Sequence, residues 1–245
     1  MSGTVFLAGA AGAIGQVLAR LLVADGWRVV GTTRHAERAR ELAALGVEPV
    51  VVDAFDGAAL SAAVRAARPD AVVHQLTDLP QVLDPATLPQ ALERNARLRE
   101  EGTRNLVAAC AGTPARRLVV QSIAFAYAPS DRPCDEAHPL NVAAANPVAA
   151  RTAAAVEVME RLCLASPLEA LVLRYGRLYG PRTWFDAPQA GCTVHVDAAA
   201  DAARRALSRG AAGIYNVAEP GGSVQVDRAR RELGWDPGFR AGEPG

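Results

Sequence analysis

The sequence predicts an α/β protein whose core is a doubly wound, mostly parallel sheet. Apolar runs of strand length alternate with segments of helical periodicity along the chain, which is the pattern of successive strand–helix–strand units. Runs such as Val50-Val51-Val52 are apolar at every position, as expected of strands that helices cover on both faces. A glycine-rich segment from Gly9 to Gly15 joins the first apolar run to the first helical segment. Together these observations indicate a Rossmann-type fold.

The predicted strands are short apolar runs in which Val, Leu, Ile and Ala recur, because such side chains pack well on a sheet covered by helices. In chain order we expect strands at residues 4–8, 28–32, 49–52, 71–74, 118–121, 170–173 and 214–217. None of these runs is long enough to be a helix in its own right. The intervals between them hold the helical segments that a parallel sheet requires.

The predicted helices are longer segments in which apolar side chains recur three and four residues apart. In chain order we expect helices at residues 14–24, 37–45, 58–67, 91–111, 148–164 and 198–208, and a short closing helix that ends at Gly234. Loops rich in Pro, Asp and Gly lie at residues 77–89, 128–147, 181–192 and 219–226. Because ligands bind at the carboxyl ends of strands in such sheets, we expect these loops to surround a binding site.

The composition excludes several classes of function. The 26 basic residues balance 26 acidic ones, so neither nucleic acid nor an anionic membrane is an expected partner. The four cysteines lie far apart and indicate neither a metal site nor a disulfide framework. No apolar run reaches the length of a membrane span and no export signal is evident, so we expect a cytoplasmic protein that binds a small molecule. A homodimer is compatible with these features.

The segment from Gly9 to Gly15 reads Gly-Ala-Ala-Gly-Ala-Ile-Gly, the spacing of a dinucleotide-binding loop. Gly9, Gly12 and Gly15 permit a tight turn, a close approach of backbone to pyrophosphate, and close packing of helix on strand. Ala13 and Ile14 open the following helix, where free N–H groups and the helix dipole favour phosphate. Glycines here could form a turn and nothing more, but the strand before them and the helix after them favour a dinucleotide site.

Residues after the second strand favour NADP over NAD. An NAD enzyme usually has an acid here, which binds the ribose hydroxyls. This chain instead has Thr33 and Arg34, with Arg38 one helical turn further on, and both arginines can pair with the 2′-phosphate of NADP. Asp53, at the end of the third strand, suits the adenine amino group. The alternatives are that Arg34 is a solvated loop residue and that Asp53 caps the next turn.

Further motifs occur in a recognisable order along the chain. Besides Asn95, they are residues 70–74 (Asp-Ala-Val-Val-His), 102–106 (Gly-Thr-Arg-Asn-Leu), 121–127 (Gln-Ser through Tyr), 174–181 (Arg-Tyr-Gly-Arg-Leu-Tyr-Gly-Pro), 195–199 (His-Val-Asp-Ala-Ala), 215–217 (Tyr-Asn-Val) and 231–237 (Arg-Glu-Leu-Gly-Trp-Asp-Pro). With the glycine loop, this series resembles the extended or atypical branch of the short-chain dehydrogenase/reductase superfamily, the relatives of NAD-dependent epimerases and dehydratases. The resemblance implies that Leu76, Thr77, Gln121 and Tyr175 line the cofactor.

The chain departs from that superfamily where its proton chemistry is expected. The catalytic unit there is a Tyr acid/base, a Lys four residues later that lowers the pKa of the Tyr, and a Ser or Thr that orients the substrate oxygen. In one register the Tyr and Lys positions hold Val148 and Thr152, and in the next they hold Ala149 and Ala153. Every basic residue of the chain is arginine, so no lysine elsewhere can replace the missing one.

The part of the chain expected to bind substrate is also short. Only the segment from Thr183 to Thr193 separates Pro181 from His195, where the superfamily usually has a longer insertion. We therefore predict one dinucleotide-binding domain over residues 1–245, with a reduced substrate-binding portion from about residue 175 onward.

Tyr127, Ser122 and His74 are the candidates for moving a proton. Tyr127 and Ser122 follow the fifth strand, where the substrate is expected. A Tyr without a neighbouring cation has a pKa of about 10, so it is a poor base at neutral pH but can still donate a proton. The alternatives are that Tyr127 is an aromatic at the rim and that His74 is a hydrogen-bonded core residue.

Three classes of function fit these features. The first is an NADP-dependent reductase that acts on a small carbonyl or sugar-like substrate with a non-standard proton donor. The second is a non-redox enzyme on the same fold, such as a dehydratase, isomerase or cyclase. The third is an NADP-binding sensor or scaffold without turnover. The cofactor loop favours the first class, whereas the missing Tyr–Lys pair keeps the other two in consideration.

Overall fold

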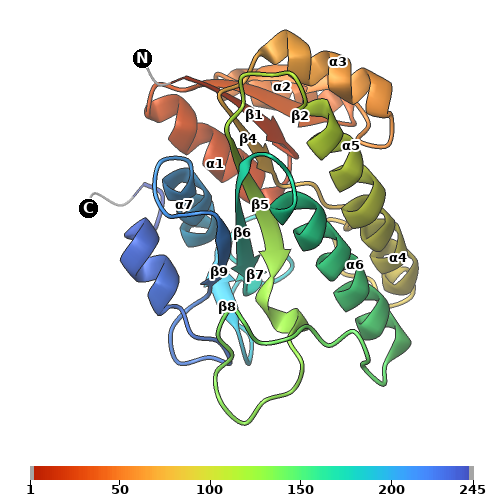
Figure 1. Cartoon of the computed structure of the whole chain (residues 1–245), viewed down its shortest axis with the longest axis vertical. Helices are drawn as coiled ribbons and strands as arrows, with labels where there is room; N and C mark the ends of the chain where they lie inside the picture. The colour runs from red at the N-terminus through yellow and green to blue at the C-terminus, as the bar shows by residue number, and fades with distance from the viewer. Residues whose placement is uncertain (1–2, 243–245) are drawn as a thin grey trace.

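The computed structural model, which describes residues 3–242, has a seven-stranded parallel sheet with helices on both faces (Figure 1). Its strands are β1 (Thr4–Ala8), β2 (Arg28–Thr33), β3 (Glu48–Val51), β4 (Ala71–His74), β5 (Arg117–Ile123), β6 (Glu169–Tyr175) and β9 (Gly213–Val217). They lie in the spatial order β3-β2-β1-β4-β5-β6-β9, and every neighbouring pair is parallel. The order reverses between β1 and β4, which is the switch point where such sheets bind ligands. The predicted Rossmann-type fold is confirmed.

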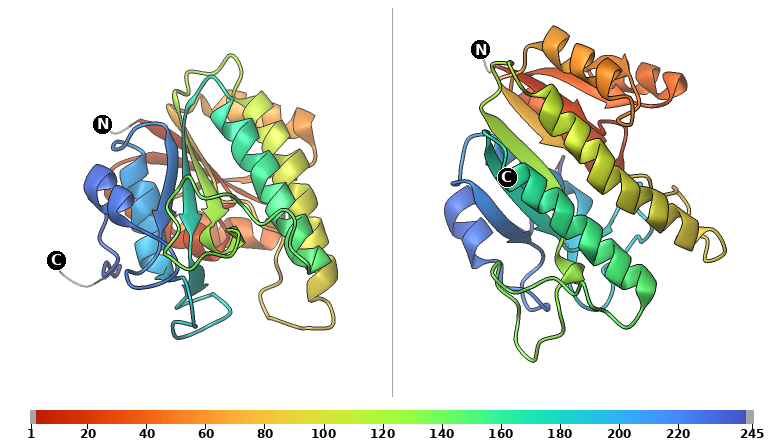
Figure 2. Two further views of the ribbon diagram at one scale, coloured as in Figure 1. Left: turned by 60° about the horizontal axis from the view of Figure 1, so that its bottom comes forward. Right: turned by 45° about the vertical axis from the view of Figure 1, so that its right-hand side comes forward.

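Two layers of helices cover this sheet (Figure 2). One layer holds α1 (Ala13–Ala24), α2 (Ala36–Ala44) and α7 (Val196–Ala206), and the other holds α3 (Gly57–Ala67), α4 (Leu88–Arg97), α5 (Thr103–Ala109) and α6 (Pro147–Leu164). Successive strand residues alternate between the layers. Val5 and Leu7 belong to the core under α1 and α7, whereas Phe6 and Ala8 belong to the core under α3 and α5. All four side chains are completely buried.

Two features of the fold differ from the sequence-based expectation. The helix expected over residues 91–111 is divided by a π-helical turn, η1 (Leu98–Gly102), between α4 and α5. Its first four residues, 98–101, are good helix formers, so composition alone does not distinguish this turn from α-helix. A second sheet pairs β7 (Arg177–Tyr179) with β8 (Thr193–His195). These three-residue strands are too short to carry a recognisable alternation.

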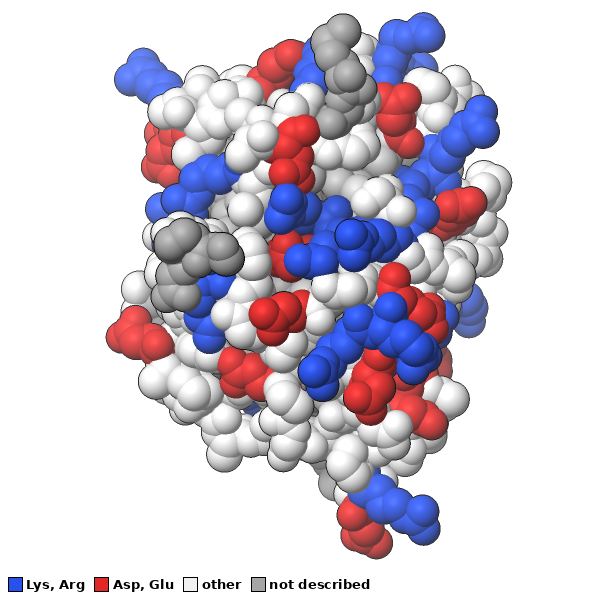
Figure 3. Space-filling view, turned by 90° about the vertical axis from the view of Figure 1, so that its left-hand side faces the viewer, with Lys and Arg blue, Asp and Glu red and all other residues white. Residues whose placement is uncertain are grey.

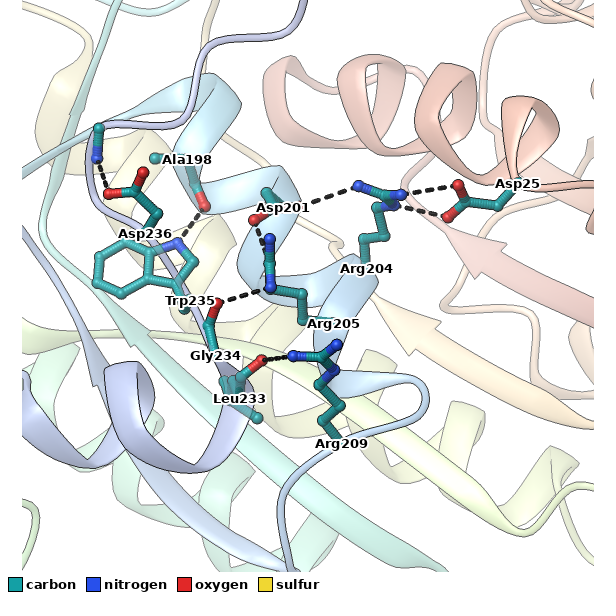
Figure 4. A network of polar contacts seen from close by, with 11 residues as sticks. Asp25, Ala198, Asp201, Arg204, Arg205, Arg209, Leu233, Gly234, Trp235 and Asp236 are labelled. Carbon is teal, nitrogen blue, oxygen red and sulfur yellow. Dashed lines mark hydrogen bonds and ion pairs between the residues drawn. The ribbon is translucent and has the colours of Figure 1, made fainter. Parts of the chain in front are cut away.

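A polar network attaches the C-terminal segment to α7, and α7 to α1 (Figure 4). The carboxylate of Asp201 is completely buried and accepts hydrogen bonds from Arg204 and Arg205. Arg204 also pairs with Asp25, at the end of α1. From the C-terminal segment, the indole of Trp235 donates to the carbonyl of Ala198 over 2.8 Å. The segment around Gly234 and Trp235 therefore packs directly onto α7, in the helical layer of the main sheet.

Basic and acidic side chains lie next to one another across the face shown in Figure 3. Ion pairs on the molecule include Arg204 with Asp25 and Arg228 with Glu232. Within residues 3–242, no helix is long and apolar enough to cross a membrane.

Candidate active site

A cleft with a volume of about 1510 Å³ runs along the carboxyl ends of the central strands. Both the glycine loop and the residues that follow β4, β5 and β6 line it, which makes it large enough for a dinucleotide and a second small molecule. The sequence-predicted residues that line it are Gly9, Gly12, Ala13, Ile14, Gly15, Thr33, Arg34, Arg38, Leu76, Thr77, Gln121, Ser122, Tyr127 and Tyr175. Asp53 and His74 are not among the described residues that line it.

The glycine loop has a backbone shape that side chains would prevent. Gly9 has a positive φ of 88°, and a Cβ added there would lie 2.4 Å from the carbonyl oxygen of Gln75. A Cβ at Gly15 would lie 2.2 Å from the carbonyl oxygen of Gly9. The N–H of Gly9 donates to the hydroxyl of Thr32 over 3.1 Å, which ties the loop to β2. Among the described residues no side chain caps α1, so its first N–H groups are available to phosphate.

Two arginines stand at the β2 side of this loop. The guanidinium of Arg34 pairs with Asp78 over 2.9 Å, and Arg38 donates to the carbonyl of Ala11 over 3.3 Å. Asp78 was not anticipated from the sequence, because it lies 44 residues further along the chain. Asp53 accepts a hydrogen bond from the N–H of Phe55 over 2.9 Å, so in this structure it closes a turn beside the cleft. Two arginines therefore line the β2 side of the cleft, and Asp78 pairs with one of them.

A buried amide lies between the glycine loop and β6. Gln75 donates to the hydroxyl of Tyr175 over 3.4 Å, and its own Oε1 atom is buried without a partner among the described residues. Burial raises the pKa of Tyr175, so its hydroxyl stays protonated. Because buried polar atoms are almost always hydrogen-bonded, a buried acceptor without a donor beside a cleft indicates a partner from outside the protein. This orphaned acceptor and the glycine cradle together fit a dinucleotide.

Tyr127 lines the cleft, but its hydroxyl is already engaged. It donates to Asn216 Oδ1 over 2.7 Å, and its ring lies against the guanidinium of Arg174, 4.8 Å from ring centroid to Cζ. Burial raises the pKa of Tyr127 to about 12, although Arg174 and the hydrogen bond to Asn216 act in the opposite direction. A cation does stand beside Tyr127, which sequence reasoning missed, yet it does not make the tyrosine a base at neutral pH.

Ser122 belongs to a buried ion-pair network. Its hydroxyl donates to Glu160 Oε1 over 2.6 Å. The same carboxylate forms a bidentate ion pair with Arg174, whose Nε and Nη2 donate over 2.9 and 2.6 Å. Although burial lowers the pKa of Arg174, the hydrogen bond and charge of Glu160 raise it above its ordinary value. The hydroxyl of Ser122 thus has an acceptor within the protein, and Glu160 has its oxygens occupied.

His74 is the last residue of β4, and its buried side chain packs against α5. Its Nδ1 accepts from the N–H of Leu76 over 3.3 Å, and its Nε2 lies 2.8 Å from the hydroxyl of Thr103 on α5. Because Nδ1 is an acceptor, Nε2 carries the proton and donates to Thr103. Burial, followed by the charge of Arg99, lowers the pKa of His74 to about 4. The geometry corresponds to the core alternative that the sequence left open for this histidine.

The wall opposite the glycine loop is formed by α6. Val148, Ala149, Thr152 and Ala153 all line the cleft there, which are the residues of both registers considered for the Tyr–Lys pair. None of them can act as an acid or base near neutral pH except through the weak hydroxyl of Thr152. Arg99, from η1, also lines the cleft and was not anticipated from the sequence.

Apolar side chains surround the mouth of the cleft. Val82, Phe125 and Val148 all line it and are 76%, 43% and 38% exposed. The indole of Trp184 donates to the carbonyl of Pro80 over 2.8 Å, so the loop after β7 touches the loop after β4 at one point. Such a rim suits a ligand with an aromatic or otherwise apolar body.

The parallel sheet, the glycine cradle at its switch point and the adjacent cleft define a nicotinamide-dinucleotide-binding protein of the Rossmann class. A family model described as the NAD dependent epimerase/dehydratase family matches residues 5–192. The chain belongs to this family, within the extended short-chain dehydrogenase/reductase superfamily, and is an NAD(P)-dependent enzyme.

Three comparisons illustrate the similarity. A Streptomyces protein named 3-diazoavenalumate denitrifying reductase is 43% identical over 95% of this chain and 82% of its own length. Thermus thermophilus UDP-glucose 4-epimerase in complex with NAD is 25% identical, with a TM-score of 0.71 over 96% of this chain and 84% of that one. Thermotoga maritima UDP-glucose 4-epimerase with UDP-glucose has a TM-score of 0.77 over 97% of this chain and 94% of that one, but is 16% identical and supports the fold alone.

Proposed function

We propose that this protein is an NADPH-dependent reductase that replaces the nitrogen of an aromatic diazo compound by hydrogen. The observation that carries the proposal is the end of the cleft lined by Tyr127 and Ser122, where no side chain among residues 3–242 is arranged as a proton relay. Tyr127 and Ser122 have their hydroxyls engaged by Asn216 and Glu160, and the chain contains no lysine. A reaction that needs no proton from the protein is compatible with such a site.

Removal of nitrogen from an aryl diazonium ion is a reaction of this kind. A hydride adds two electrons at the ring carbon, the carbon–nitrogen bond breaks with its electron pair, and N₂ leaves. The product carries a C–H bond, and atoms and charge balance without a donated proton. NADPH supplies a hydride when bound. The name of the Streptomyces relative, a denitrifying reductase of a diazo compound, supports this reaction class for the present chain.

The cofactor part of the proposal is NADP rather than NAD. Gly9, Gly12, Ala13, Ile14 and Gly15 would hold the pyrophosphate through backbone N–H groups. Arg34 and Arg38 would pair with the 2′-phosphate, with Thr33 beside them. Towards the adenine and nicotinamide ends, the residues that would complete the site are Asp53, Leu76, Thr77, Gln121 and Tyr175.

The cleft walls give this binding a defined direction. The cations of the β2 side lie next to the glycine loop, since Arg38 donates to Ala11 within it. On the other side of the glycine loop, Gln75 lies between Gly9 and Tyr175 of β6. The acceptor would then lie between Tyr175 and α6, under the apolar rim of Phe125 and Val148.

A carbonyl or sugar-like acceptor is the alternative that must be tested against this proposal. Reduction of a carbonyl leaves an alkoxide, which has to be protonated. Tyr127 is the nearest candidate, and a hydroxyl whose pKa is raised to about 12 can donate but is held by Asn216. The two acceptor classes therefore differ in whether they depend on Tyr127.

Isotope transfer provides the test. Purified protein is supplied with NADPH that carries deuterium at nicotinamide C4, together with diazotised aminobenzoates and aminocinnamates. We expect protein-dependent consumption of NADPH, release of N₂ and one deuterium on the ring carbon that carried the nitrogen. A reaction without protein is the control, because diazonium ions also react with reductants in solution.

Other outcomes of the same assay would contradict the proposal. Turnover of aldehydes or ketones, with deuterium on the carbinol carbon and no turnover of diazo compounds, would identify a carbonyl reductase. Binding of NADPH by calorimetry, without turnover of either class, would favour a sensor or a non-redox enzyme.

A further inference from the structure

Arg99 is a buried charged side chain in the cleft that has no hydrogen-bond or ion-pair partner among the described residues. Arg99 lines the cleft and is 7% exposed. Within residues 3–242 its guanidinium forms neither a hydrogen bond nor an ion pair. The carboxylate of Glu160 attracts it from a greater distance, but the Glu160 oxygens are hydrogen-bonded by Arg174 and Ser122. Buried guanidinium groups are otherwise almost always paired.

The π-helical turn accounts for the position of Arg99. η1 lies between α4 and α5 and packs against α6, in the row of helices at the right of Figure 1. A π turn changes the direction in which side chains leave a helix and is frequent at functional sites. Opposite it, α6 contributes Thr152 and the small Ala153 to the cleft. A long side chain from η1 can therefore reach the cleft beside these two uncharged residues of α6.

Arg99 is charged despite its burial. Burial lowers its pKa to about 10, with Glu160 acting in the opposite direction, so the group is protonated at neutral pH. Arg174 makes the contrast clear, because it is as deeply buried but hydrogen-bonded by Glu160 and by the carbonyl of Glu136. An unpaired buried charge lowers stability, and such a group in a cleft is a candidate for binding a ligand.

We propose that Arg99 binds an anionic oxygen, a carboxylate or phenolate, of the acceptor substrate. A guanidinium presents five donors in a planar fork that matches carboxylate geometry. The phosphates of the cofactor have Arg34, Arg38 and the start of α1 on the β2 side, whereas Arg99 lies towards Glu160 of α6. The apolar rim would contact the body of an aromatic ligand. The anionic group of that ligand would then reach Arg99 deeper in the cleft.

This inference rests on the proposed reductase function but can be tested without turnover. The probes are 4-hydroxycinnamate and its methyl ester, titrated by calorimetry into protein saturated with NADP⁺. The variants are Arg99→Met, which keeps length without charge, and Arg99→Lys, which keeps charge. Arg104→Met is the matched control, because it removes one positive charge from an exposed position on the adjoining α5.

We expect the natural protein to bind the acid more tightly than the ester. Arg99→Met should weaken binding of the acid by about 10- to 100-fold, the range for a lost hydrogen bond to a charged group. It should change ester and NADPH affinities by less than about twofold, and Arg99→Lys should recover part of the loss. Arg104→Met should behave as the natural protein.

Three results would overturn the assignment. The first is equal affinity of the natural protein for the acid and the ester. The second is an equal decrease in the affinities for acid and ester in Arg99→Met. The third is a parallel decrease in NADPH affinity, which would assign Arg99 to a cofactor phosphate. A thermal melt supplies an independent readout. Without ligand, Arg99→Met should unfold a few degrees above the natural protein, because an unpaired buried charge is removed. A large decrease in the melting temperature of Arg99→Met would show that the Arg99 guanidinium has a stabilising partner in the folded protein.

Discussion

The two walls of the cleft are built on different principles. On the wall formed by β1 and β2, backbone geometry leaves polar groups available, because Gly9 and Gly15 shape the loop and no described side chain caps α1. On the wall formed by β5, β6 and α6, side chains satisfy one another, as Ser122, Glu160 and Arg174 do. The glycine loop thus leaves backbone groups available to a ligand, whereas Ser122, Glu160 and Arg174 satisfy one another. Arg99, on η1 beside that network, has no hydrogen-bond or ion-pair partner among the described residues.

The largest expected effect comes from closing the cradle. Gly9→Ala should lower NADPH affinity by more than about 100-fold, because the new Cβ lies 2.4 Å from the Gln75 carbonyl and Ala disfavours the positive φ of 88°. Gly112→Ala is the control, since Gly112 also has a positive φ, 72°, but has nothing within 4 Å. Calorimetry measures both after circular dichroism has confirmed folding. Unchanged affinity in folded Gly9→Ala would contradict the role of the loop.

The second effect concerns His74, the buried last residue of β4. Its pKa is lowered from 6.5 to about 4, chiefly by burial, so the folded state keeps it neutral while the unfolded state gains a proton. The resulting contribution to the free energy of unfolding is about 3 kcal/mol. It is fully present above pH 6.5, decreases as the pH falls, and is lost once the pH falls through 4. In urea titrations at pH 7 and 4.5, His74→Gln should show a weaker loss of stability than the natural protein. An equal pH dependence would show that His74 is not buried as a neutral group.

The third effect sharpens the assignment of the cofactor. Arg34→Asp removes the partner of the 2′-phosphate and adds repulsion, so NADPH binding should weaken by about 2 kcal/mol, or roughly 30-fold. Binding of NADH should not weaken. Because Arg34 pairs with Asp78 without ligand, Asp78→Asn should free the guanidinium and modestly strengthen NADPH binding. Equal affinities of the natural protein for NADPH and NADH, measured by calorimetry, would overturn this assignment.

The smallest expected effect is at Tyr127. If the acceptor takes a hydride without a proton, Tyr127→Phe should change the rate of diazo reduction by less than about threefold, whereas loss of a positioned acid typically costs about 10²- to 10⁴-fold. The pKa of Tyr127 is raised to about 12, so its ionisation should not shape the rate between pH 6 and 9. A large decrease in the reduction rate of Tyr127→Phe would instead support Tyr127 as the proton donor, as the sequence predicts.

The sequence carried most of the fold because the relevant signals are local. All seven strands of the main sheet were predicted within two residues of their bounds, since short apolar runs between helical segments leave few alternatives. Local patterns did not reveal β7 and β8, whose three-residue strands pair only in the folded chain. The π turn η1 was also missed, because it uses the same residue types as an α-helix.

For the site, the sequence determined the cradle and the absence of lysine, because both follow from which residues occur at which spacing. Only the tertiary structure decided how the polar groups are used. It pairs Arg34 with Asp78, Ser122 with Glu160, and Tyr127 with Asn216, and each of these partners is distant in the chain. Burial and hydrogen-bond satisfaction depend on what surrounds a group in space, so sequence spacing cannot distinguish a paired arginine such as Arg174 from an unpaired one such as Arg99.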